Sequence, residues 1–588
     1  MATFERILTW FVDEVGSFVW NFGIPVGEET IPLVVILLLG TGTWLTLRLG
    51  FIQLRRLGHG FAVTSGKYDD PDEPGDVSHF QALTTALSAT VGIGNIAGVA
   101  IALHYGGPGA LFWMWMTAFL GMALKYSEVV LAQEYREVGP DSDPKRWEGS
   151  VSGGPMYYIE KGLGKNWKWM AVLFAAILGV TAFLTGNGIQ ANTVADTMQT
   201  EFGVPNWITG LVTASLVAAV ILGGITRIGR VTGILAPLMA AIYVLGALFI
   251  ILVNIAQVPE TFGLIFREAF NPTAGVAGTG AGAFLVTLMW GVRRGLFSNE
   301  AGQGSAPIAH SAAKTDEPVS EGVVALLEPF IDTLVICTMT GLVIIMTGAY
   351  SARVPTELAL GAGDMSWVTV DETGRGHAVE ALPQSIPYSD GRPAGTGGED
   401  VVLAWHDVAV ERVFIDRAMT QPFTGEITFA PTGIRARDAA GEYTSLYGEA
   451  AETGAPLTML GFQIGLPGTF GQYIVIISVL LFAISTAISW SYYGDRCANY
   501  LFGPKAVLPY KMVFVLLHFV GAVLPLTVIW DLGDVFLGMV IIPNLIALIV
   551  LAPEVSAMTK SYFERRPWVS NEDAHRRYLE DRRAGRRK

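Results

Sequence analysis

The chain has 588 residues, of which 51% are hydrophobic and only 15% are charged, whereas about a quarter of the residues in soluble globular proteins are charged. These proportions exclude a disordered chain and a nucleic-acid-binding protein with a basic surface. Two cysteines, Cys337 and Cys497, are too few for a disulfide scaffold or for a zinc site of their own. The mean hydropathy of +0.45 favours one large membrane body over about four soluble domains.

Residues 4–22 are predicted to form an amphipathic helix on the membrane surface. A signal peptide is not expected, because Asp13 and Glu14 interrupt a short apolar run and no cleavage site follows. Eleven later stretches approach the ~20 apolar residues that a membrane-spanning helix needs. These predicted spans lie near 31–49, 80–103, 109–134, 168–186, 207–223, 231–254, 281–303, 322–348, 470–492, 512–530 and 535–555.

Lysine and arginine are distributed unevenly between the loops that join these spans. The loops after spans one, three, five, seven and nine carry fifteen of them, whereas the short loops on the other side carry only Arg267. Positively charged loops stay in the cytoplasm. We therefore predict a multi-pass protein of the cytoplasmic (inner) membrane with its N-terminus outside and its C-terminus, including a basic tail over 556–588, in the cytoplasm.

The connection over 350–469 differs from the other loops in length and charge. It holds sixteen Asp or Glu, seven Arg and no Lys, a net charge of −9 out of −14 for the whole chain. Trp367–Val370, Val410–Ile415 and Glu426–Ile434 mix β-branched and aromatic residues between Gly and Pro turns, which predicts short strands. We expect a small β-rich extracytoplasmic domain that acts as a solvated cap, with a binding function as the alternative.

Two apolar segments contain glycines and polar residues that an ordinary spanning helix avoids. The first is Ser88–Gly98, and the second is Trp290–Gly302. Unsatisfied backbone groups at membrane mid-depth cost several kcal/mol, so such a break must be buried in protein or line a cavity. The alternative is that Gly92, Gly94 and Gly98 only allow close helix packing. Two matched breaks favour a central binding site.

The two breaks also resemble each other in sequence. Gly94-Asn95-Ile96-Ala97-Gly98 matches Ser298-Asn299-Glu300-Ala301-Gly302 at a spacing of 204 residues. Five spans follow from each break, and an odd number per repeat inverts the second copy in the membrane. Paired interruptions of this kind indicate the binding site of a secondary transporter, as in the leucine-transporter fold. We predict an all-α, 5+5 inverted repeat preceded by one extra span.

That prediction divides the chain into segments. The N-terminal segment and first span cover 1–79, the first repeat covers 80–254, and the second repeat covers 281–349 and 470–555. The acidic insertion over 350–469 interrupts the second repeat, and the basic tail follows it at 556–588.

Several motifs in spans two to eleven resemble the alanine or glycine:cation symporter family. The most specific is Gly106-Gly107-Pro108-Gly109-Ala110-Leu111-Phe112-Trp113-Met114-Trp115-Met116. Gly153–Ile159, Asn187–Asn192 and Gly295–Gly302 add to it, while the insertion departs from the usual compact pattern. The resemblance implies a sodium-coupled importer of small neutral amino acids with the leucine-transporter type of fold, no enzyme activity and no cofactor other than the co-transported sodium ion.

The resemblance also implies roles for individual residues. Backbone around Thr90, Gly92 and Gly94 would receive the substrate carboxylate, because a half-helix N-terminus attracts anions. Thr486 and Trp490, four apart on one helical face, would face the substrate. The remaining predicted site residues are Asn187 and Gln190 for the substrate, with an interhelical hydrogen bond as their alternative, and Val91, Asn95 and Ser485 for sodium.

Ionisable residues inside the bilayer are functional candidates by default. One hypothesis is that Arg293 and Arg294 form a network with Glu328 and Asp332 that gates or braces the site; the favoured alternative is a static ion pair that only satisfies buried charge. Lys125 and Glu128, three apart, are expected to pair locally.

The function predicted overall is sodium-driven import of alanine or glycine by alternating access. Proton coupling is the alternative, and a carboxylate between Ser88 and Gly98 would favour it, but none is present. A receptor that uses the 350–469 domain is a third possibility. The preferred amino acid and the oligomeric state stay open.

Overall fold

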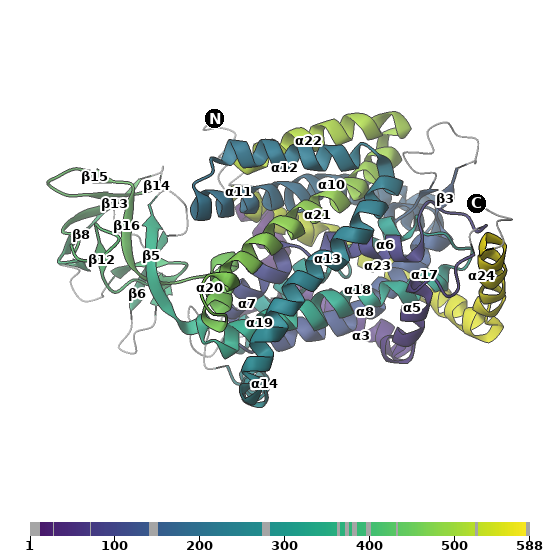
Figure 1. Ribbon diagram of the computed structural model, residues 1–588, viewed down its shortest axis with the longest axis horizontal. Helices are drawn as coiled ribbons and strands as arrows, with labels where there is room; N and C mark the ends of the chain where they lie inside the picture. Colours follow the sequence, from purple (N-terminus) through teal and green to yellow (C-terminus); the bar gives the residue numbers. More distant parts are fainter. Residues whose placement is uncertain are drawn as a thin grey trace.

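The computed structural model describes residues 12–26, 29–70, 72–139, 151–272, 283–360, 365–370, 376–378, 385–394, 401–430, 433–523 and 527–583. Figure 1 shows a helical body with β-strands gathered at one end and the C-terminal helix α24 (Trp568–Arg583) at the other. The strands of the insertion and helix α24 therefore lie at opposite ends of the body. The first part of the predicted N-terminal helix lies outside the described residues, which begin with a π-helical turn and α2 (Ser17–Asn21).

Each of the eleven predicted apolar stretches coincides with helix. Within the described residues, six helical segments are long and apolar enough to cross a membrane, or seven if one bent pair counts as a span. The helices are α3 (Leu33–Arg48), α6 (His79–Thr90) with α7 (Val99–Gly106), α8 (Ala110–Glu134), α10 (Lys168–Phe183) with α11 (Ile189–Phe202), α12 (Asn206–Ile221), α13 (Gly224–Val253), α15 (Ala283–Asn299), α17 to α19 (Pro318–Met346), α21 (Phe470–Phe502), α22 (Val507–Val523) and α23 (Thr527–Arg565). The number that actually crosses remains a prediction.

Shorter helices join these long ones. They are α4 (Ile52–Arg55), α5 (Leu57–Thr64), α9 (Pro155–Gly162), α14 (Val258–Phe270), α16 (Ala306–His310) and α20 (Gly454–Gly465).

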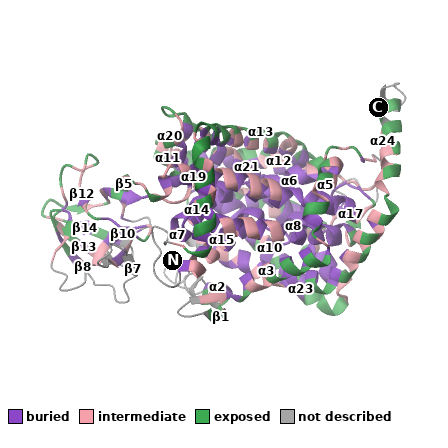
Figure 2. Cartoon of the chain, turned by 90° about the horizontal axis from the view of Figure 1, so that it is seen from below, coloured by how far each residue is buried: buried purple, intermediate pink, exposed green. Residues whose placement is uncertain are grey.

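Apolar side chains cover the outside of the helical body as well as its core. Leu238, Leu245 and Phe249 on α13 are 51–64% exposed, and α12 and α22 carry similar residues. Figure 2 shows exposed residues along α13 and α14 and buried residues in the interior. Many polar side chains, by contrast, are buried in the interior of the body. This inside-out distribution is expected of a body that sits in lipid.

The first predicted break is present. A capping box between Ser78 and Gln81 starts α6, which ends at Thr90. A π-helical segment over Gly94–Gly98 leads into α7, and the two halves bend by 52°. Two further π-helical segments interrupt other spans, at Leu184–Gly188 between α10 and α11 and at Phe330–Cys337 in the helix of span eight. Such segments often occur at functional sites.

The second break begins only near the end of the predicted segment Trp290–Gly302. Residues 283–299 form one continuous helix, and the interruption begins at Glu300, whose φ is +54°. Gly302 and Gly304 also have positive φ before α16 begins. The predicted glycines instead pack the helix closely on α8: a Cβ on Gly291 would lie 2.5 Å from the Ala110 carbonyl oxygen. Close helix packing, the alternative considered above for the glycines of the first break, therefore explains these glycines of the second segment.

The insertion contains three antiparallel sheets with strand orders β11-β10-β6-β7, β12-β16-β5 and β15-β14-β13-β8-β9. Their core includes Trp367, Tyr388, Phe423 and Leu446. The strands are β5 (Arg353–Ala359), β6 (Met365–Val370), β7 (Gly376–Ala378), β8 (Ser385–Ser389), β9 (Arg392–Pro393), β10 (Val401–Trp405), β11 (Val408–Ala409), β12 (Val413–Phe414), β13 (Gly425–Ala430), β14 (Gly433–Arg437), β15 (Glu442–Tyr443) and β16 (Ser445–Ala451). Helix α20, although inside the predicted β-rich range, packs on the body instead, where the Thr458 hydroxyl donates to the Ile96 carbonyl (2.8 Å).

Candidate functional site

The two helix breaks meet in the interior of the body. A Cβ on Gly94 would lie 3.0 Å from the Phe297 ring and 3.3 Å from the Ser298 Cα, so a larger residue would have to push these neighbours back. The Asn95 amide Nδ2 donates to the Ser298 hydroxyl at 3.1 Å. The sequence match that paired Asn95 with Asn299 therefore corresponds to segments that are in contact.

Asp332, in the π-helical segment of span eight, supplies a carboxylate to this contact. Asn95 Nδ2 donates to one carboxylate oxygen at 2.6 Å, and the hydroxyls of Ser298 and Thr333 donate to the other at 2.8 and 2.7 Å. In the sequence, only a carboxylate within the first break was taken as a sign of proton coupling, and Asp332 was predicted to join an arginine network. Because Asp332 lies four residues after Glu328, the sequence indicated that both side chains share an inward face. No sequence pattern indicated that Asp332 would contact Asn95 on a distant span.

The side chain of Asn95 also stabilises the break itself. Its Oδ1 accepts the Gly92 backbone N–H at 2.8 Å, and its carbonyl accepts the Thr340 hydroxyl at 2.9 Å. Asn95 is fully buried. Each of its polar groups therefore has a partner, as a group this deep in a membrane protein requires.

Helix α21 covers the end of α6. The Thr486 hydroxyl donates to the carbonyls of Ser88 and Ala89 at 3.0 and 3.3 Å, and the Ser485 hydroxyl lies 3.4 Å from the same Ser88 carbonyl. A Cβ on Gly92 would lie 2.7 Å from Thr486 Oγ1. Carbonyls that the break frees from helix bonding are thus gathered against two hydroxyls.

The Thr90 hydroxyl bonds back to its own helix, at 3.3 Å from the Ala86 carbonyl. Val91 ends the helix, where its N–H donates to the Leu87 carbonyl at 2.7 Å.

Trp490 lies one turn further along α21 and is 1% exposed. Its indole N–H donates to Glu300 Oε1 at 3.0 Å, and the other oxygen of Glu300 accepts the Ser305 hydroxyl at 2.5 Å. A Cβ on Gly186 would lie 2.3 Å from Trp490 Cγ, so the indole fills the space beside the break in span four. Trp490 thus connects span four to the second break.

Asn187 and Gln190 are buried but bond elsewhere. Asn187 donates to the Phe514 carbonyl at 2.8 Å, and its oxygen lies 2.6 Å from His518 Nδ1, both on α22. Gln190 donates locally to the Thr185 carbonyl at 3.1 Å. The contacts of Asn187 are those of the interhelical alternative.

The predicted arginine network is not formed. Arg294 Nη2 pairs with Asp534 of α23 at 3.1 Å, and its guanidinium lies over Trp290, Phe297 and Trp530. Arg293 lies over the Trp20 ring. Both arginines lie on the side of α15 that faces α2 and α23. They therefore point away from span eight and from Asp332.

Lys125 does not form its predicted local pair either. It reaches Glu328 on span eight at 3.0 Å, while Glu128 accepts the side-chain amide of Asn544 at 2.6 Å. Both lysine and glutamate turn inward from one face of α8, where partners on other helices are nearer than each other.

A helical body with lipid-facing apolar sides, two broken helices in contact and a buried polar centre defines a multi-pass membrane transporter. The model of the sodium:alanine symporter family matches residues 7–366 and 410–576. The chain belongs to this family of cation-coupled amino acid symporters, and it is not an enzyme. Between residues 7 and 576 the match leaves out 367–409, so the departure from the family in this region is narrower than the predicted 350–469.

Similar proteins cover almost the whole chain. The sodium/alanine symporter AgcS of Methanococcus maripaludis is 40% identical over 558 residues, which is 94% of this chain and 97% of that protein. An uncharacterized transporter of Haemophilus influenzae is 37% identical over 96% of this chain and 97% of its own length. The crystal structure of MhsT in complex with L-phenylalanine aligns with a TM-score of 0.46 at 11% identity, over 83% of this chain and 98% of that one.

Proposed function

We propose that the chain is a sodium-coupled symporter that imports a small neutral amino acid, alanine or glycine, across the cytoplasmic membrane. The observation that carries the proposal is the junction of the two breaks, where Asn95 joins Ser298 and Asp332. The proposal includes alternating access between two inverted five-span repeats, 80–254 and 281–349 with 470–555. It also includes the orientation with the N-terminus outside.

The sodium site is proposed beside Asn95, where the Asp332 carboxylate, the Ser298 hydroxyl and carbonyls near Val91 offer hard oxygen ligands. Oxygen ligands of this kind suit a small hard cation. Ser485, beside the Ser88 carbonyl, offers further oxygens from α21. All of these groups are buried, so a bound ion would be shielded from water.

The substrate site is proposed along Thr90, Gly92, Gly94, Thr486 and Trp490. Trp490 occupies the space that a long substrate side chain would need, which favours alanine or glycine. Gln190 remains a candidate contact because its Oε1 has no hydrogen-bond partner within the described structure. Asn187 is proposed to support the wall of the site through α22.

Ion and substrate binding are coupled in this proposal through one oxygen. Asn95 Oδ1 now accepts the Gly92 N–H, so an ion that draws this oxygen away frees the Gly92 N–H for the substrate carboxylate. A released N–H at the break also carries the partial positive charge of a helix N-terminus. Sodium would therefore raise the affinity for the amino acid.

Proton coupling is the second candidate, and Asp332 is the observation that favours it. A carboxylate at the junction can bind a proton as well as ligate a cation. Alanine uptake into proteoliposomes with an imposed sodium gradient or an imposed proton gradient distinguishes the two. We expect uptake to follow sodium at constant pH, and uptake that follows only the pH gradient would refute sodium coupling.

A receptor role for the insertion is tested by removing its strands. Arg353 pairs with Ala451 across β5 and β16, so the two ends lie side by side and a short glycine linker can replace 354–450. Helix α20 must remain because it contacts the first break. Retained sodium-driven uptake would place the transport function in the helical body, and loss of alanine binding by a folded variant would favour the receptor role.

A further inference from the structure

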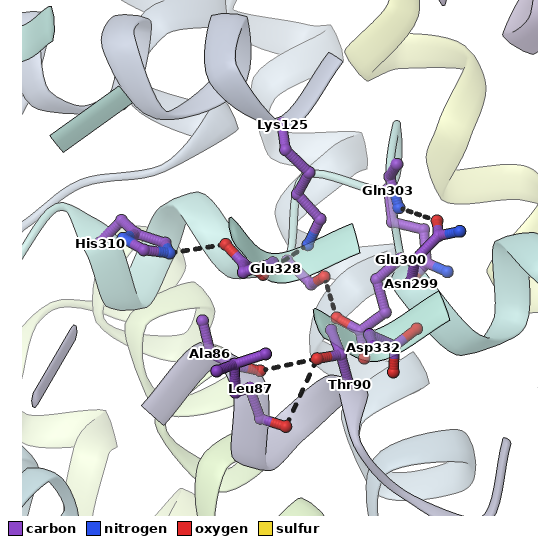
Figure 3. A network of polar contacts seen from close by, with 12 residues as sticks. Ala86, Leu87, Thr90, Lys125, Asn299, Glu300, Gln303, His310, Glu328 and Asp332 are labelled. Atoms are coloured by element: carbon purple, nitrogen blue, oxygen red, sulfur yellow. Dashed lines mark hydrogen bonds and ion pairs between the residues drawn. The ribbon is translucent and has the colours of Figure 1, made fainter. Parts of the chain in front are cut away.

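Five buried ionisable side chains form a continuous chain that the proposed transport site does not use. His79 Nδ1 contacts Glu321 Oε2, and Glu321 Oε1 lies 2.5 Å from His310 Nδ1. His310 Nε2 lies 2.6 Å from Glu328 Oε1, and Lys125 Nζ lies 3.0 Å from Glu328 Oε2. Figure 3 shows His310 and Lys125 reaching Glu328 from two directions. We name these five residues the buried charge chain.

The buried charge chain connects elements on both sides of the breaks. His79 is the first residue of α6, which forms the first half of the first broken helix. His310 ends α16, the short helix that follows the second break. Glu321 lies on α17 (Pro318–Ala325), Glu328 on α18 (Leu327–Pro329) and Lys125 on α8. Movement of either half-helix must therefore break a contact in this chain.

The geometry fixes how many protons the chain holds. Each of the three imidazole–carboxylate contacts needs one proton between its nitrogen and its oxygen. Two neutral imidazoles provide only two such protons, and His310 uses both of its nitrogens. One additional proton is required. With it, Lys125 and one imidazolium balance the two carboxylates; without it, a net charge of −1 remains among side chains that are at most 2% exposed.

Other charged groups surround the chain and set its electrostatic background. Glu128 on α8 and Glu300 at the second break face Lys125, and Tyr493 of α21 faces Glu328. Asp69 and Glu73 face His79 from the segment before α6. Arg136, beyond α8, interacts with Glu321 and also with Asp316 and Asp76. These neighbours are mostly acidic, so they favour retention of the additional proton.

We propose that the buried charge chain is a proton-binding site that locks the cytoplasmic half of the symporter closed. The inference rests on the proposed function. With the additional proton bound, every contact is made and α6 is held to α16 and α17. Loss of the proton sets a lone pair of one imidazole against a carboxylate oxygen, so one of the three contacts opens, the continuous chain no longer ties α6 to both α16 and α17, and α6 can move away.

The test is alanine exchange in proteoliposomes with equal sodium on both sides, measured from about pH 6 to about pH 9, the range in which paired histidines titrate. We expect the wild-type rate to rise with pH, by at most about tenfold per pH unit for one dissociable proton. E321Q and E328Q each supply a carboxamide that donates as well as accepts. Neutral imidazoles then satisfy every contact, so both variants should lose this rise.

The matched control is H79Q. Its amide donates one hydrogen bond to Glu321, but His310 still bridges two carboxylates and still needs the additional proton. H79Q should therefore keep the rise with pH that E321Q and E328Q lose. Alanine binding to each purified variant shows that it is folded, and one folded glutamine variant is sufficient.

The outcomes separate the two proposals. Wild-type exchange that does not change with pH, or a rise that persists in E321Q or E328Q, overturns the proton site while leaving symport intact. A wild type that exchanges no alanine at any pH refutes the proposed function instead.

Discussion

Replacing Asp332 with asparagine should lower the sodium affinity of transport. The substitution keeps the size of the side chain and removes the charge at the centre of the junction. A unit charge 4 Å from a cation contributes about 4 kcal/mol at an effective dielectric constant of about 20, which we take as the limit here. That energy corresponds to roughly a thousandfold in sodium affinity. Because the Asn95, Ser298 and Thr333 donors can redirect to other oxygens, we expect a loss of at least about tenfold within this limit.

The measurement is the sodium concentration that gives half-maximal alanine uptake by proteoliposomes. Asp196→Asn on α11, which lies apart from both breaks, is the matched control and should behave as wild type. Alanine binding at saturating sodium checks that the Asp332 variant is folded. A sodium dependence identical to that of wild type would show that Asp332 does not ligate the ion, and the site would then have to lie at Ser485 and α21.

Three further outcomes follow from other contacts. Gly186→Ala sets a Cβ against the rigid base of the Trp490 side chain, so we expect a loss of about 1–3 kcal/mol in stability and reduced uptake, read as a lower Tm and a lower initial rate. Arg294→Ala removes the partly buried pair with Asp534, which contributes about 1 kcal/mol. The buried Cys337 should then become more accessible. In a Cys497→Ser background, we expect the rate at which an impermeant thiol reagent labels Cys337 to rise about fivefold. Burial raises the pKa of Glu73 to about 7 and outweighs the hydrogen bond from the Asn571 amide of α24, which lowers it. The stability gained by burying protonated Glu73 against α24 is therefore present below about pH 4.5 and is lost as the pH rises through 7. Amide exchange of α24 should quicken over that window, and Glu73→Gln should remove the change.

The sequence predicted the helical segments well because a membrane span needs a long apolar run, and such a run is a local property. The first break was also predictable, since Gly92, Gly94 and Asn95 combine conformational freedom with a polar group at mid-depth. Of the predicted second break, Trp290–Gly302, only the last part interrupts the helix. Gly291 and Gly295 lie against α8, whereas Glu300 and Gly302 adopt the positive φ values that interrupt the helix.

Partners across the body were beyond the reach of the sequence. The spacing of Glu328 and Asp332 placed both on one face, but not which helix each would meet. Lys125 bonds Glu328 across 203 positions of the chain, and Asn95 bonds Asp332 across 237. Sequence spacing reports faces of a helix, while pairing depends on how the helices pack. Charge alone therefore suggested an arginine network where the structure has a lysine–histidine chain.

In the proposed mechanism, Asn95 links the geometry of the break to the occupancy of the site. Its oxygen caps the Gly92 N–H, its nitrogen binds Asp332, and its carbonyl accepts Thr340, so one residue holds the first broken helix to span eight. An unsatisfied polar group at this depth costs several kcal/mol. A change in any one partner must therefore be compensated by the others. An ion that competes for Asn95 changes the backbone that would receive the amino acid, which gives this junction a physical basis for coupling.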